Sequence, residues 1–102
     1  MLKFEAWDRE HYLGHATEHV RRGLVDGHRV ELHVSRYSED TAQIWHASVL
    51  LDGETIWQPR TWWNAEGLKG AKSKILHQAH EVLNLRGYKI RCHFCGFPEN
   101  IP

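Results

Sequence analysis

Within residues 28–35, polar and apolar side chains alternate from Arg29 onward, which is the pattern of a half-buried β-strand. Val30, Leu32 and Val34 fall on one side of this strand. Residues 43–51 form a second predicted strand, and Asp52-Gly53 after it predicts a two-residue turn of type I′. A third strand then runs from Glu54 through Trp57, and Pro59 either ends it or places it on a sheet edge.

The Asp52-Gly53 turn also fixes the register of the strands that it joins. Leu51 is expected to face Glu54, and Val49 is expected to face Ile56. Cross-strand partners share a face, so one face carries Trp45, Ala47, Val49, Leu51 and Ile56. The other face carries Ile44, His46, Ser48, Leu50 and Trp57. The first face is the better core, and the second is either covered by a helix or left as an exposed apolar patch.

Two helices are predicted on either side of these strands. The first spans residues 8–24, with Asp8 as its N-cap and Gly23 near its end. Its apolar stripe consists of Tyr12, Leu13, Ala16, Val20 and Leu24. The second spans residues 65–85, with Asn64 as its N-cap and Gly87 as its C-terminal stop. Its apolar positions are Leu68, Ala71, Ile75, Ala79 and Val82.

The predicted fold is α+β, with a small antiparallel sheet of three to four strands and two helices in the order α-β-β-β-α-(β). Residues 88–94 would form the last strand, and residues 96–102 a C-terminal tail. We expect one domain over residues 1–102, with the long helix covering the face that carries Trp45, Val49 and Ile56.

Cellular location follows from what the chain lacks. No apolar run approaches the ~20 residues that a membrane helix needs, and the first residues lack the apolar region of a signal peptide. Cys92 and Cys95 are the only cysteines, and two residues between them is a poor spacing for a structural disulfide. We therefore expect a cytoplasmic protein with no membrane association.

The same two cysteines suggest a metal site. Thiolates at Cys92 and Cys95 can bind one zinc ion, and His77 and His80, on the expected solvent side of the long helix, would complete a tetrahedral set. Against this, a strand running through Cys95 would point the two sulfurs to opposite faces. A second group, His11, His15 and His19, has the spacing of a helical metal chelate but also of residues bordering a core.

Charge is distributed unevenly along a chain whose net charge is zero. Residues 1–59 carry a net charge of −4, and residues 60–91 carry a net charge of +5. The basic part also holds aromatic residues, which suggests a partner-binding surface of Trp57, Arg60, Trp62, Trp63, Lys69, Lys72 and Lys74. The alternative is that the tryptophans anchor the connection between strand and helix.

The element order, with lysines in Gly67–Lys74 near the start of the last helix, resembles the topology of double-stranded RNA-binding domains. That resemblance implies a basic helix terminus that meets phosphates. The zero net charge argues against strong non-specific binding to nucleic acid.

No phosphate-binding loop, nucleophile elbow or His-Glu-x-x-His motif occurs in the sequence, which favours a non-catalytic role. An enzyme that uses some of the nine histidines in acid–base catalysis stays open as a third class. The predicted function is that of a small binding or regulatory domain, with a protein or a nucleic acid as its partner. The alternative is a zinc-stabilised module, which a chelator would unfold. A homodimer through the second sheet face is a further option.

Overall fold

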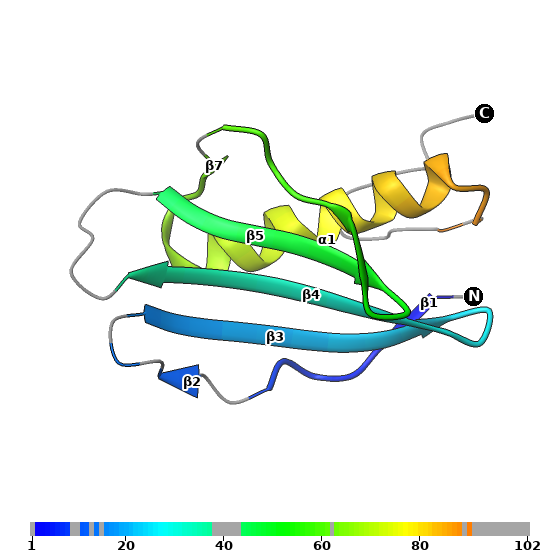
Figure 1. The fold of residues 1–102 in the computed structure, drawn as a ribbon, viewed down its shortest axis with the longest axis horizontal. Coiled ribbons are helices and arrows are strands. Elements are labelled where there is room, and N and C mark those ends of the chain that lie inside the picture. The colour runs from blue at the N-terminus through cyan, green and yellow to red at the C-terminus, as the bar shows by residue number, and fades with distance from the viewer. Residues whose placement is uncertain are drawn as a thin grey trace.

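The computed structural model describes residues 2–8, 11–12, 14, 16–37, 44–61, 63–88 and 90. Its strands are β1 (Leu2–Phe4), β2 (His11–Tyr12), β3 (Ala16–Val25), β4 (His28–Tyr37), β5 (Ile44–Leu51), β6 (Glu54–Trp57) and β7 (Trp63–Asn64), and its helix is α1 (Gly67–Leu85). The strands form an antiparallel sheet in the order β1-β3-β4-β5-β6, with β2 paired to β3 and β7 paired to β5 (Figure 1).

The predicted fold class is wrong, because residues 8–24 do not form a helix. The chain instead forms β1, β2 and the ten-residue β3, so α1 is the one helix of the described residues. Ala16, Val20 and Leu24 recur every fourth residue, and this spacing places them on one face of a strand as readily as on one side of a helix. Without an N-terminal helix, the resemblance to double-stranded RNA-binding domains loses its basis.

A second Asp-Gly turn explains why residues 16–25 form a strand of a hairpin rather than part of a helix. Asp26 and Gly27 have φ values of 48° and 83°, nearly the same as the 51° and 84° of Asp52 and Gly53. Positive φ at both central residues is the signature of a type I′ hairpin. The turn joins β3 to β4, and all ten residues of β3 pair with β4, from Val25 opposite His28 to Ala16 opposite Tyr37.

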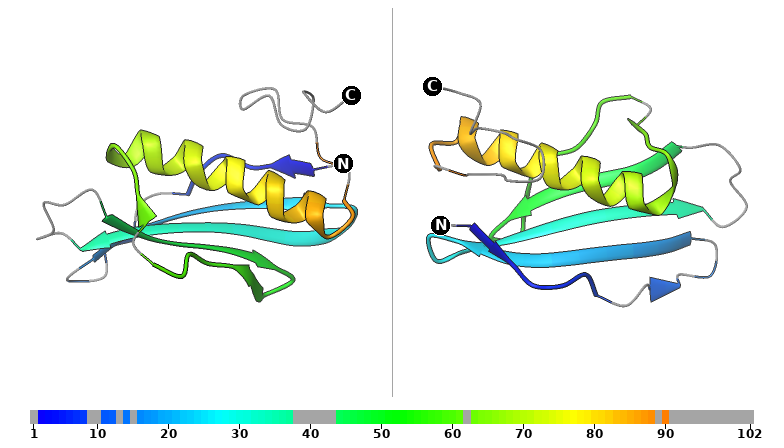
Figure 2. Two further views of the ribbon diagram at one scale, coloured as in Figure 1. Left: turned by 90° about the horizontal axis from the view of Figure 1, so that it is seen from above. Right: turned by 180° about the vertical axis from the view of Figure 1, so that it is seen from behind.

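Helix α1 lies across one face of the sheet, and the core fills the space between them (Figure 2). The prediction that Val30, Leu32 and Val34 share a buried face is confirmed, as is the burial of Trp45, Ala47 and Val49. The buried helix residues are Ala71, Ile75, Ala79, His80 and Leu83.

The helix boundaries differ slightly from those predicted. Glu66, rather than Asn64, is the N-cap residue, and Gly87 follows the C-terminus with a φ of +99°. Tyr88 and Ile90 are not in a strand, and the rest of the predicted last strand and the tail lie outside the described residues. Over the described part of the chain, no helix combines the length and the apolar character that crossing a lipid bilayer requires.

The predicted register of the β5–β6 hairpin is correct at the turn and wrong beyond it. Leu51 pairs with Glu54, but Val49 pairs with Trp57 rather than with Ile56. The register shift, a β-bulge, leaves Ile56 as the extra residue of β6. Trp57 therefore joins the helix side of the sheet, where it is half-buried, and the open face loses the tryptophan expected there.

Gly23 is required where β1 pairs with β3. A Cβ atom at this position would lie 2.5 Å from the Lys3 carbonyl oxygen and 2.5 Å from Cδ1 of Phe4. We expect Gly23→Ala to lower the free energy of unfolding by about 1–3 kcal/mol, as overpacking does. Gly70→Ala, within α1, is the matched control, because the atom nearest to the added Cβ would be Cβ of Glu66 at 3.7 Å. That change should raise stability by about 0.5–1 kcal/mol. Urea denaturation measures both, and equal effects would contradict this account.

Candidate ligand-binding groove

Hydroxyl and imidazole side chains form a regular array on the sheet face opposite α1. The register places His33 of β4 opposite Ser48 of β5, and Ser35 opposite His46. Glu18 of β3 lies opposite Ser35 on its other side. Because cross-strand partners project to the same face within about 5 Å of each other, these five side chains form one continuous polar floor.

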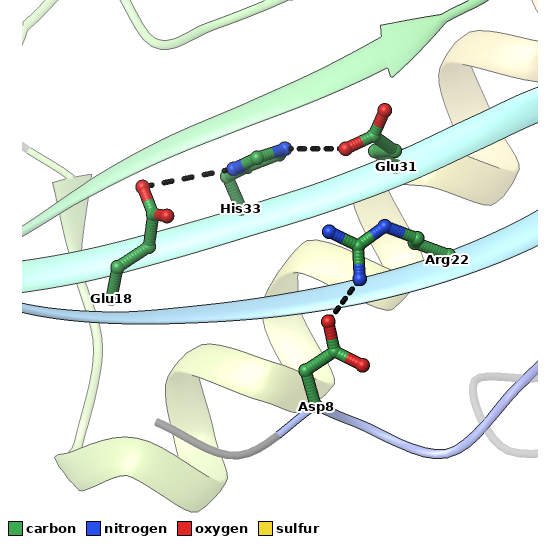
Figure 3. A network of polar contacts seen from close by, with 5 residues as sticks. All are labelled: Asp8, Glu18, Arg22, Glu31 and His33. Atoms are coloured by element: carbon green, nitrogen blue, oxygen red, sulfur yellow. Dashed lines mark hydrogen bonds and ion pairs between the residues drawn. The ribbon is translucent and has the colours of Figure 1, made fainter. Parts of the chain in front are cut away.

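Ion pairs and hydrogen bonds link part of this floor into a network (Figure 3). The two ring nitrogens of His33 face two carboxylates, with Nδ1 3.8 Å from Oε2 of Glu18 and Nε2 3.1 Å from Oε1 of Glu31. Beside them, Arg22 donates a hydrogen bond to Asp8, and this bond raises the pKa of the guanidinium. His33 therefore bridges two carboxylates of neighbouring strand residues, and the Arg22–Asp8 pair lies beside them.

The wall of the groove forms where the chain leaves the edge of β5. Trp57 pairs with Val49, and Trp63 pairs with Trp45. Five residues separate Trp57 from Trp63 along the chain, whereas three separate Trp45 from Val49, so the segment must loop outward. Pro59 lies in that segment and has no N–H to donate to a sheet ladder, which explains why pairing stops there.

The looped segment and the polar floor enclose a groove of about 1000 Å³. Gln58, Pro59, Arg60 and Thr61 line its wall, while the floor contributes Glu18, His33, Ser35, His46 and Ser48. Trp45 and Ala47 of β5 also line it. The volume lies at the upper end of the range found for ligand sites.

Trp45 lines the groove, but its indole nitrogen lies in the interior of the protein. Its side chain is 6% exposed, and its indole Nε1 is buried without a hydrogen-bond partner among the described residues. An unpaired buried donor costs about 1–3 kcal/mol.

The structure brings together some of the described residues that were predicted to form one binding surface. Trp63 is buried, and its ring makes a T-shaped contact with Trp57, with 6.2 Å between the ring centroids. The ammonium group of Lys74 lies 4.9 Å from the Trp63 ring and donates a hydrogen bond to the carbonyl of Asn64. Lys72 similarly covers Trp7 at 5.1 Å. These residues anchor the start of α1 to the sheet.

The remaining members of that predicted surface are Arg60, Lys69 and Trp62. Arg60 is exposed and belongs to the groove wall, and Lys69 is exposed on α1. Trp62 lies outside the described residues. The structure therefore assigns Arg60 to the groove, whereas Lys72 and Lys74 pack against tryptophan rings.

Of the candidate metal ligands, some lie outside the described residues and the others lie on several different elements. Cys92 and Cys95 lie outside the described residues, as does His15. His80 is 6% exposed between α1 and the sheet, so its predicted place on the solvent side is wrong. His77 is half-buried, His11 is exposed on β2, and His19 is buried on β3. Among the described residues, no three His, Cys, Asp or Glu side chains are grouped to hold a metal ion.

Sequence reasoning missed most of the groove. The alternation in residues 28–35 did place His33 and Ser35 away from the core, and the turn register did place His46 with Ser48. It did not predict that β3 is a strand paired with β4. This pairing brings Glu18 to the same surface.

No known protein-family model matches this chain, and neither a curated protein nor a solved structure is significantly similar to it.

Lys74 should contribute to stability because its ammonium group contacts Trp63 and Asn64. We expect Lys74→Met to lower the free energy of unfolding by about 0.5–1 kcal/mol, the range of an exposed cation–π contact. Lys69→Met is the matched control, since Lys69 is exposed on the same helix, and should change stability by less than about 0.5 kcal/mol. Chemical denaturation compares the two variants. Equal losses would show that Lys74 has no special role in packing.

His80 should make the protein sensitive to acid. Burial lowers the pKa of His80 to about 4, and the positive charges of His77 and Arg21 add to this effect. Because the unfolded chain binds the proton more tightly, the stabilisation is fully present above pH ~6.5 and is lost as the pH falls toward 4. The loss amounts to at most about 3 kcal/mol.

The test compares unfolding free energies at pH 7 and pH 4.5 for the wild type, His80→Gln and His77→Gln. The His80→Gln variant should lose markedly less stability between the two pH values. The His77→Gln control should keep most of the wild-type dependence. An unchanged pH dependence in His80→Gln would refute the assignment.

Proposed function

We propose that this protein is a peptide-binding domain that holds an extended polypeptide segment in the groove between the open sheet face and residues 58–61. The observation that carries the proposal is the composition of the groove. Ser35, Ser48 and Gln58 each donate and accept hydrogen bonds. A polypeptide backbone offers both kinds of group at every residue, so it complements such a lining.

The apolar part of the groove also fits a polypeptide ligand. Ordinary ligand sites combine an apolar lining with a few polar groups, and Trp45, Ala47 and Pro59 supply the apolar part here.

The charges of the groove favour a polypeptide over a nucleic acid. Arg60 is its single lysine or arginine among the lining residues, and the carboxylate of Glu18 lies in the floor. Nucleic-acid affinity depends on several cations that neutralise phosphates. Lys72 and Lys74, which the sequence offered for this role, lie over indole rings instead.

The polar network supports binding rather than catalysis. A histidine that activates a serine must direct one ring nitrogen at the hydroxyl. In the groove, Nδ1 and Nε2 of His33 face Glu18 and Glu31. The arrangement fixes the imidazole in place and does not aim it at Ser48.

The proposal is tested by panning a phage library of random heptapeptides against the immobilised protein and measuring the affinity of the enriched peptides. The variant Ser48→Arg places a long cation in the groove floor and should weaken binding at least tenfold. Thr55→Arg is the matched control, because Thr55 is exposed on the same sheet face and does not line the groove. That variant should bind within twofold of the wild type.

A 20-nucleotide oligothymidylate at low salt provides the competing measurement. We expect no binding of this probe. Salt-dependent binding to the oligonucleotide, together with no enrichment of peptides, would refute the peptide-binding function and favour a nucleic-acid partner.

A further inference from the structure

We infer that the groove takes its peptide as an added β-strand, which pairs with Ala47 of β5 between β6 and β7 and carries a small residue opposite Ala47. This inference rests on the peptide-binding function proposed above and adds the mode of binding and the sequence preference. Strand addition to an open sheet edge is a recurring mode of peptide recognition.

The backbone of Ala47 points toward the groove. Leu51 and Glu54 flank a two-residue turn, so they exchange backbone hydrogen bonds and the N–H and C=O of Leu51 point to β6. Asp52, the next residue, donates its N–H to the Arg29 carbonyl on β4 at 2.7 Å. Because the direction alternates along a strand, Val49, Ala47 and Trp45 point away from β4.

Ala47 is the residue at which this outer edge lacks a partner strand. Val49 pairs with Trp57 and Trp45 pairs with Trp63, and Ala47 lies midway between them. Within the described residues, Ala47 is in neither of these ladders and takes part in none of the backbone hydrogen bonds of turns and loops. It does line the groove. The N–H and C=O of Ala47, a residue that is 9% exposed, therefore have no backbone partner on this edge within the described residues.

The two tryptophans beside Ala47 restrict the residue that pairs with it. Cross-strand partners project to the same face, so the peptide residue opposite Ala47 would point to the helix side. Trp57 and Trp63 flank that position, and only 6.2 Å separates their ring centroids. Because these rings are in T-shaped contact, this position favours a small residue such as glycine, and a larger side chain would have to displace an indole ring.

The neighbouring peptide residues meet a different surface. Side chains alternate along a strand, so the residues on either side would project over the open face, near His46 and Ser48. The Glu18 carboxylate, whose side chain is 33% exposed, lies in the same floor. Charge complementarity therefore favours lysine or arginine at one of these positions. The preferred peptide has a small residue between two polar residues, at least one of them basic.

Amide hydrogen exchange, followed by nuclear magnetic resonance on the whole protein, tests the pairing directly. The Ala47 N–H should exchange fast in the free protein and at least tenfold more slowly when saturated with a heptapeptide selected by panning. The Ser48 N–H, which points to β4, is the internal control and should be protected in both states. An Ala47 N–H that is protected in the free protein, or unaffected by bound peptide, overturns strand addition.

A peptide series tests the sequence preference. In the selected heptapeptide, each residue is replaced in turn by leucine and by its N-methyl derivative. One position should lose at least tenfold in affinity under both changes, because it needs both a small side chain and a free N–H. The inference would be overturned if the leucine and N-methyl replacements reduced affinity at different positions, or if neither reduced it at any position. If panning yields no peptide, the proposed function itself fails, whereas a bound peptide that leaves Ala47 unchanged refutes only the added strand.

Discussion

The carboxylate of Asp52 joins the two hairpins on which the sheet is built. Its Oδ1 accepts a hydrogen bond from the Arg29 N–H at 2.9 Å, and its Oδ2 lies 2.7 Å from Nδ1 of His28. These contacts lower the pKa of Asp52, with the Arg29 backbone hydrogen bond as the largest cause. One side chain at the tip of the β5–β6 hairpin thus holds the first residues of β4. The register of β4 against β5 is fixed at the same end as both Asp-Gly turns.

Register decides which chemistry each face of the sheet presents. A slip of one residue would exchange the two faces, moving Val30, Leu32 and Val34 to solvent and the polar floor into the core. With the observed register, apolar side chains meet α1, while His33, Ser35, His46 and Ser48 gather on the open face. The groove therefore depends on the turns, although it lies at the far end of β5.

The sequence predicted the parts of this fold that depend on local chemistry. The Asp52-Gly53 turn and the apolar alternation of residues 28–35 are local signals, and both were interpreted correctly. The spacing of Ala16, Val20 and Leu24 is not a local signal, because period 2 and period 3.6 both accommodate steps of four. The Asp26-Gly27 pair would have resolved it, since it has the same turn chemistry as Asp52-Gly53.

The candidate site was harder to predict, because composition does not reveal which charged and aromatic groups the fold itself uses. Lys72 and Lys74 cover Trp7 and Trp63, so residues that resemble a nucleic-acid platform in the sequence stabilise the junction between helix and sheet. The groove arises instead from a mismatch of chain length, with five residues spanning a gap of three beside β5. Pro59 prevents this segment from pairing with β5 along its whole length, because proline has no N–H to donate to the sheet. A sheet edge that its own chain cannot complete is suited to pairing with another.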